Sequence, residues 1–122
     1  MGRIKIEAVV AEFIAMTLFV IIGCGSACAT AGSGGHLVLI SLAFGLAITA
    51  LAYSIGAYSG GHINCAVTLG LVLVGACDWL QGICNVVAQI FGSFAGALIL
   101  CLMFPREKDM TGQLAANVVS WF

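Results

Sequence analysis

An all-α membrane protein is predicted by three features of this 122-residue sequence: scarce charge, long apolar runs and one polar interruption. Charged residues make up 7% of the chain, against roughly 25% in soluble domains. Neither Lys, Arg, Asp nor Glu occurs in residues 13–77 or in residues 79–105. We therefore expect one unit over residues 1–122, built from three transmembrane helices plus one re-entrant loop and half-helix.

The first helix is expected over residues 7–28, because at about 1.5 Å per residue this length crosses a hydrocarbon core of roughly 30 Å. A secretory signal peptide is the alternative, since basic residues precede an apolar centre and residues 27–29 are similar to a cleavage site. Glu12 and the two later apolar spans favour an uncleaved helix. Arg3 and Lys5 ahead of it predict a cytoplasmic N-terminus.

A polar, glycine-rich stretch follows a second helix, which is expected over residues 37–58. The stretch SGGHINCAVTLG begins at Ser59 and interrupts a chain that otherwise suits lipid. Irregular backbone at membrane depth occurs only where protein surrounds it or where it lines a wet cavity. Asn64 is a good N-cap for a half-helix that begins at Cys65 and is too short to cross. Residues 59–74 are therefore expected to re-enter the membrane and to line a pore.

The last span is expected over residues 83–104, where Gly92 and Gly96 form a GxxxG face that allows close helix approach. Residues 105–117 are expected to form an external loop with balanced charge, and residues 118–122 are similar to the beginning of a fourth helix.

The stretch that begins at Ser59 resembles the first signature loop of the aquaporin and glycerol-facilitator family, the major intrinsic proteins, usually written SGGHxNPAVTLG. AEF at Ala11, GCGS at Gly23 and ISLAFGL at Ile40 resemble the same family. The family's NPA is NCA here, because Cys65 stands in place of proline. The resemblance implies an aquaporin-like half, the first of two inverted repeats whose half-helices meet N-terminus to N-terminus.

A passive water channel, or the first half of one, is the function that this resemblance implies. The implied pore-lining residues are Phe44, Gly60, Gly61, His62, Ile63, Asn64, Ala66 and Val67. The Asn64 amide would bind passing water, and the loop carbonyls would supply the acceptors on which water steps. Phe44 corresponds to the family's aromatic constriction and favours water over glycerol.

Several of these residues also have a structural interpretation. Asn64 can serve as a helix cap alone, and Phe44 can simply pack between helices. His62 is interpreted as a hydrogen-bonded structural side chain, with a pH-responsive gate as the alternative. Cys65 lies at a helix N-terminus beside Asn64, and we expect it to be the pore thiol through which mercurials block the channel.

Glu12 and Gln89 are predicted to support the loop. An uncompensated charge inside an apolar span is costly, so Glu12 needs partners. We expect its carboxylate to accept hydrogen bonds from His62 or from backbone amides of the loop, with an acid/base role as the lesser alternative. Gln89, in the third span, is expected to satisfy loop backbone.

Other function classes have weaker support. A half-length interaction or regulatory subunit without its own pore is the main alternative, and a facilitator of glycerol or another small neutral solute is a further one. An enzyme is not expected, because neither a catalytic triad, a phosphate-binding loop nor paired carboxylates are found. The six cysteines lack zinc-ligand spacing, so we expect no metal and no cofactor.

The expected partners are the lipid bilayer, water and possible small neutral solutes. By resemblance, the chain is expected to form a homo-oligomer, a tetramer, or to join a missing second half. The net charge of -1 argues against nucleic acid. We expect an integral, multi-pass protein of the plasma membrane.

Overall fold

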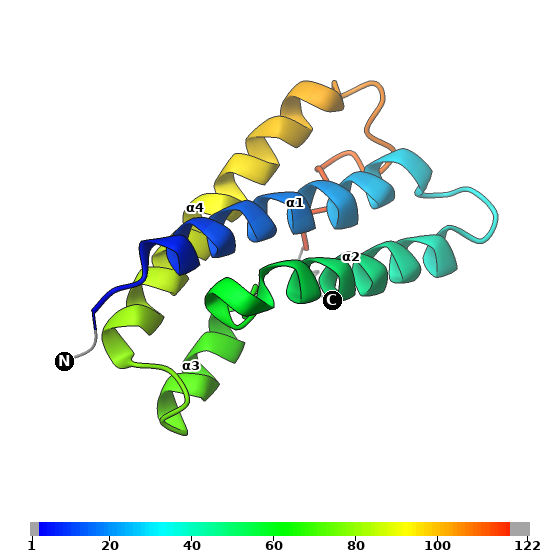
Figure 1. Cartoon of the computed structure of the whole chain (residues 1–122). Coiled ribbons are helices and arrows are strands. Elements are labelled where there is room, and N and C mark those ends of the chain that lie inside the picture. The colour runs from blue at the N-terminus through cyan, green and yellow to red at the C-terminus, as the bar shows by residue number, and fades with distance from the viewer. Residues whose placement is uncertain (1–2, 118–122) are drawn as a thin grey trace, which may run out of the picture.

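A computed structural model describes residues 3–117 and arranges them as four α-helices. Their bounds are Ile6–Thr30 for α1, His36–Ser59 for α2, Cys65–Leu73 for α3 and Trp79–Met103 for α4. Figure 1 shows α1 and α2 side by side and antiparallel, with α4 packed against α1 and the short α3 beyond the end of α2. The expected start of a fourth long helix, at residues 118–122, lies outside the described residues.

Three of these helices are long and apolar enough to cross a membrane: α1, α2 and α4, with 25, 24 and 25 residues. The remaining helix, α3, has 9 residues. Its length is therefore roughly 14 Å, about half of a hydrocarbon core of roughly 30 Å. Within residues 3–117, the expected all-α fold with three spans and one half-helix is confirmed.

The start of α4 differs from the sequence-based expectation. The helix begins at Trp79 rather than at Ile83, because Asp78 caps it. The Asp78 Oδ1 atom accepts the N–H of Leu80 at 3.0 Å. A carboxylate is favourable at this position, where unpaired N–H groups and the positive end of the helix dipole meet it. The apolar pattern alone missed this first turn, since it places helix boundaries by hydrophobicity.

Close packing of α4 on α1 depends on two glycines. A Cβ atom at Gly92 would lie 2.5 Å from the Phe13 carbonyl oxygen, and one at Gly96 would lie 2.8 Å from that of Thr17. Both distances are too short for a side chain. The Thr17 hydroxyl also donates across the interface to the Gly92 carbonyl oxygen at 3.1 Å. The GxxxG face of α4 is therefore its contact with α1.

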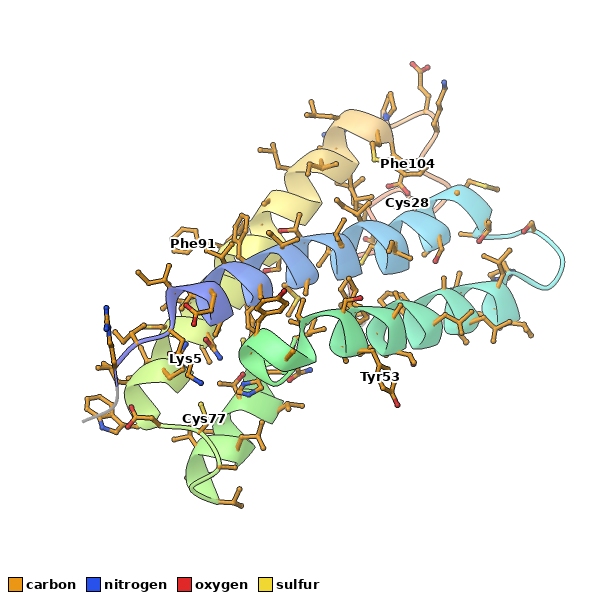
Figure 2. The ribbon with its side chains drawn as sticks, viewed as in Figure 1. Lys5, Cys28, Tyr53, Cys77, Phe91 and Phe104 are labelled. Atoms are coloured by element: carbon orange, nitrogen blue, oxygen red, sulfur yellow. The ribbon has the colours of Figure 1, made fainter. Side chains whose placement is uncertain are left out.

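Most of α2 is exposed, in contrast to α1 and α4. Its buried residue is Ala47, and Tyr53 points away from α1 with 87% of its surface exposed (Figure 2). Among the described helices, α2 packs on α1 and α3 packs on α4, with no packing contact between α2 and α3. The chain therefore leaves a gap between α2 and α3 that the connecting loop spans.

Candidate functional site

The loop between α2 and α3, residues 60–64, follows a backbone path that favours glycine. Gly60 and Gly61 have φ angles of +89° and +68°, and a Cβ atom at Gly61 would lie 2.8 Å from the Ala52 carbonyl oxygen. Ile63 also has a positive φ, +44°, which is unusual for a β-branched residue. Such a conformation persists only where the surroundings hold it in place.

Glu12 of α1 holds this loop. Its side chain is fully buried. The Oε1 atom accepts the hydroxyl of Ser59 (2.6 Å) and the N–H of His62 (2.9 Å), while Oε2 accepts the N–H of Ile63 (2.7 Å) and Nε2 of Gln89 (2.8 Å). Four donors thus surround the carboxylate, as burial of such a group requires. Two of the donors are the loop backbone amides that the sequence suggests as partners.

Thr68 of α3 joins the loop to α4. Its hydroxyl donates to the Asn64 carbonyl oxygen (3.0 Å) and accepts Nε2 of Gln89 (3.0 Å). Nδ1 of His62 lies 3.1 Å from the same hydroxyl oxygen and donates to it when Nδ1 carries the ring proton. Gln89 therefore contacts the side chains of Glu12 and Thr68, not the loop backbone predicted from the sequence. Its support of the loop is indirect.

A groove of about 490 Å³ lies between α2 and α3. Its lining comes from α1, α2, the loop and α3: Phe19, Phe44, Gly45, Ile48, Gly61, His62, Ile63, Asn64 and Val67. Within the part of the chain that the structure describes, the carbonyl oxygens of residues 60–63 accept no hydrogen bond. The groove therefore combines an apolar wall with unpaired backbone acceptors.

Asn64 lies at the point where the loop becomes α3. Its Oδ1 atom accepts the N–H groups of Ala66 (2.8 Å) and Val67 (3.3 Å), which caps the helix. This contact fixes the orientation of the amide and leaves Nδ2 as a donor without a partner among residues 3–117. Because Asn64 also lines the groove, that donor is available to a molecule bound there.

Phe44 is held at the groove by α1. Its ring packs edge to face against Phe19, with ring centroids 5.5 Å apart and an interplanar angle of 73°. A Cβ atom at Gly23 would overlap the same ring. The absence of a side chain at Gly23 therefore allows the ring to lie where it does.

A second cavity, of about 760 Å³, adjoins the loop near the N-terminal segment. Its lining includes Lys5, Gly60, His62 and Cys77, and Figure 2 shows Lys5 and Cys77 at the same end of the molecule. Burial raises the pKa of the Cys77 thiol, and the neighbouring Asp78 carboxylate adds to this shift. His62 lines both this cavity and the groove.

The structure brings most of the predicted pore-lining residues together. Those on the groove are Phe44, Gly61, His62, Ile63, Asn64 and Val67. Gly60 lines the second cavity instead, and Ala66 is exposed and lines neither. Cys65 is exposed but is not part of the groove lining, because it lies two residues, roughly 200° of helical rotation, from Val67. Its role as a pore thiol stays a prediction.

Sequence reasoning missed three groove residues, Phe19, Gly45 and Ile48. Ile48 follows Phe44 by one helical turn, so extending the helical spacing from Phe44 would have found it. The sequence pattern contains no comparable signal for Phe19, which reaches the groove through the packing of α1 on α2.

The structure defines a class of protein, the integral membrane proteins with a re-entrant segment along a groove. The defining features are the three apolar spans, the strained loop held between them and the half-helix that Asn64 caps. Comparison with known proteins identifies the family. The family model described as "Major intrinsic protein" matches residues 3–121. The chain belongs to the major intrinsic protein family, and the resemblance found in its sequence is confirmed.

Curated relatives include aquaporins. Aquaporin-5 of Mus musculus is 44% identical over 114 residues, which cover 93% of this chain and 42% of that protein. Aquaporin-1 of Sus scrofa is 45% identical over 103 residues, or 77% of this chain and 38% of that protein. The lens fiber major intrinsic protein of Ovis aries is 38% identical over 113 residues, or 93% and 42%. The chain spans about two fifths of the length of these relatives.

Proposed function

We propose that this chain is a passive water channel of the aquaporin family, or the first half of one, and that the groove is one wall of its pore. The observation that carries the proposal is the groove itself, where residues 61–63, whose carbonyls are unpaired, and the Asn64 amide lie beside apolar side chains. The names of the aquaporin relatives support the same function.

In this proposal, water passes by exchanging its bulk hydrogen bonds for those of the loop. A water molecule in the groove donates to a carbonyl oxygen of residues 61–63 and accepts from Nδ2 of Asn64. The apolar side chains opposite these groups keep the binding weak enough for water to leave. The positive end of α3 and the Asn64 donor both orient a nearby water molecule with its oxygen toward them. Protons move along a file of water molecules that all point the same way, and this reoriented water interrupts such a file.

Phe44 is the proposed limit on the width of the pore. Its ring packs on Phe19 of α1 and occupies the space at Gly23, and in this position it narrows the groove. We therefore propose water as the main substrate. Glycerol or another small neutral solute is the alternative that a solute permeability assay would test.

The groove is bounded by this chain on one side, since Asn64 and Val67 are exposed. A closed pore therefore needs a second wall, and we propose that another copy of the chain or a complementary half supplies it. By family resemblance, the assembly is a tetramer in the plasma membrane, with Arg3 and Lys5 on the cytoplasmic side. The broadly exposed α2 favours such association, and an interaction subunit without its own pore is the second candidate function.

Stopped-flow shrinkage of proteoliposomes that contain this chain alone tests the proposal. We expect osmotic water permeability above that of protein-free vesicles. Permeability equal to that of lipid would reject an autonomous channel and favour the interaction subunit. Asn64→Asp is the sharp variant, because it keeps the capping oxygen and removes the amide donor, and we expect it to lower water permeability. Ser54→Ala is the matched control, since the exposed Ser54 hydroxyl bonds only within α2.

Cys65 is proposed as the thiol through which mercurials inhibit the pore, because it is exposed next to Asn64. The Cys65→Ala variant is expected to keep water permeability and to lose mercurial inhibition. Cys101→Ala serves as the control, since Cys101 is also exposed but lies near the far end of α4. Unchanged inhibition in Cys65→Ala would reject this role.

A further inference from the structure

Two buried amide side chains on α4 each keep one polar atom without a partner. These atoms are Nδ2 of Asn85, a donor, and Oε1 of Gln89, an acceptor, and neither has a hydrogen bond within residues 3–117. The exposed fractions of the two side chains are 0% and 1%. Buried polar groups in native proteins almost always find a partner, either in the protein or in an ordered water molecule. Both atoms therefore require an explanation.

The orientations of both amides are fixed by their other contacts. Gln89 Nε2 donates to Glu12 Oε2 (2.8 Å) and to Thr68 Oγ1 (3.0 Å), and flipping the amide would set its oxygen against the carboxylate. At the other end, the Lys5 N–H donates to Gln81 Oε1 (2.7 Å), and Gln81 Nε2 donates to Asn85 Oδ1 (2.8 Å). The free atoms are thus a donor and an acceptor, and rotating an amide cannot satisfy them.

The two free atoms belong to residues one helical turn apart. Side chains at positions i and i+4 lie on the same face of a helix, with Cβ atoms about 5–6 Å apart. Asn85 and Gln89 have this spacing on the face of α4 that is buried with Gly82, Gly92 and Gly96. A free donor and a free acceptor on the same buried face, one turn apart, are the groups that one bridging water molecule can satisfy.

We propose that a single water molecule binds between Asn85 and Gln89, accepting Asn85 Nδ2–H and donating to Gln89 Oε1. This water completes a polar chain that runs from the Lys5 backbone at the start of α1, through Gln81 and Asn85, to Gln89 and Glu12. Because Glu12 holds the loop between α2 and α3, the water also supports the loop from behind. The inference does not depend on whether the groove conducts water.

The alternative is a dry site in which both atoms remain unpaired. The two cases predict opposite results for Asn85→Leu. In both cases the substitution removes the acceptor of Gln81 Nε2, a contact on the Lys5 side. In a dry site it otherwise removes only an unsatisfied buried donor, so Gln89 and the loop are held as tightly as before. With a water bridge, it removes a hydrogen bond to the water, and the Gln89 amide becomes less well fixed against Glu12.

The first experiment detects the water in the unaltered protein. Nuclear Overhauser effects between water and the ¹⁵N-labelled side-chain amides are measured on the full chain in lipid nanodiscs. The nuclear Overhauser effect at the Asn85 amide is expected to have the algebraic sign that is typical of a long-lived bound water. The exposed Gln113 amide, which bonds in the loop after α4, is the reference for bulk water. No signal at Asn85, or the sign seen at Gln113, would overturn the proposal, and this result needs no variant to fold.

The second experiment asks whether the water supports the loop. Amide hydrogen exchange is measured at Ile63, whose N–H donates to Glu12. Asn85→Leu is expected to accelerate it about tenfold, the effect of losing one ordinary hydrogen bond. Ser93→Ala is the matched control on α4, because the Ser93 hydroxyl bonds only to the Ile90 carbonyl oxygen of its own helix. Unchanged or slower exchange in Asn85→Leu would show that no bridging water holds Gln89.

Discussion

Between α1 and α4 the buried carboxylate of Glu12 is fully hydrogen-bonded within the protein, whereas along the groove between α2 and α3 the loop carbonyls and the Asn64 amide donor have no partner within residues 3–117. All four hydrogen bonds accepted by Glu12 are made inside the protein. The carbonyl oxygens of residues 60–63 accept none within the described chain, although they belong to the loop that Glu12 holds. The carboxylate is satisfied by its own contacts, and the loop carbonyls remain available to a ligand.

This difference explains how a strained loop can be both rigid and open. The N–H groups of His62 and Ile63 donate to the Glu12 carboxylate, which fixes the loop backbone. The carbonyl oxygens of the loop take no part in this contact and remain unpaired. A loop held through its own carbonyls would have nothing to offer a ligand. Disrupting the α1–α4 side is therefore expected to damage the whole fold, and disrupting the groove side to change permeability with little loss of stability.

Glu12→Gln is expected to have the largest effect. In the unaltered protein each Glu12 oxygen accepts two hydrogen bonds at a fully buried site. Glutamine replaces one of these oxygens with an NH₂ group, which cannot accept, so two hydrogen bonds are lost. Hydrogen bonds to charged groups contribute about 1.5–3 kcal/mol each, so the free energy of unfolding should fall by about 3 kcal/mol or more. Thermal unfolding in detergent measures this change. Glu7→Gln, on the exposed first turn of α1, removes only a helix-dipole interaction and should lower stability by less than about 1 kcal/mol, and equal losses in both variants would contradict the prediction.

Gly92→Ala is expected to have the second largest effect on stability. The added Cβ atom would lie 2.5 Å from the Phe13 carbonyl oxygen, and backbone cannot move aside as a side chain can. Forcing α1 and α4 apart should lower the free energy of unfolding by about 1–3 kcal/mol. Gly70→Ala on α3 is the matched control, because its Cβ atom meets nothing within 4 Å and alanine favours a helix. A stable Gly92→Ala variant would mean that this close approach does not hold the interface together.

Gly23→Ala probes the groove side. Its Cβ atom would overlap the Phe44 ring, which can rotate away because it is the end of a side chain. The displaced ring is expected to enter the groove and to lower water permeability in stopped-flow assays, while the free energy of unfolding changes by only about 1 kcal/mol. Gly34→Ala, in the turn before α2, has open space and should change neither quantity. If Gly23→Ala destabilises the protein as much as Gly92→Ala, the proposed contrast between the two sides is wrong.

The smallest effect is expected at Asp109, in the loop after α4 and away from both regions. The Thr111 hydroxyl and then the Leu114 N–H lower the pKa of this carboxyl from 3.8 to about 2. A lowered pKa in the folded state means that the contribution of Asp109 is present above the unfolded value and is lost as pH falls from 3.8 toward about 2. The Leu114 amide chemical shift should therefore titrate near pH 2.

Asp109→Asn should abolish this titration, whereas Glu107→Gln, an exposed neighbour without a described hydrogen bond, should leave it in place. A midpoint at the ordinary value of 3.8 would show that the described contacts do not lower the pKa of Asp109.

Much of the fold could be predicted from the sequence because the signals of membrane helices lie in short stretches of neighbouring residues. Long apolar runs without charge locate α1, α2 and α4, and Asn64 marks the start of α3 by its capping chemistry. The start of α4 was harder, since Asp78 is polar and belongs to the helix end only through its bond to Leu80. The mutual dependence of Glu12 and the loop also follows from the sequence, because a charge in an apolar span requires partners.

The partners themselves could not be predicted. Gln89 contacts Glu12 and Thr68 instead of loop backbone, because the crossing of α1 and α4 at Gly92 sets which side chains meet. Phe19 was missed for a similar reason, since helical spacing does not say which face of α1 packs on α2.

The sequence by itself determined the membrane setting, the three spans, the half-helix and the family, because hydropathy, capping and a signature loop are properties of neighbouring residues. Only the tertiary structure decided that four donors converge on Glu12, that loop carbonyls remain unpaired beside Phe44, and that the Asn85 and Gln89 amides lack partners. Those facts depend on how closely and at what register α1, α2 and α4 pack, and no local pattern encodes the distance between residues far apart in the chain.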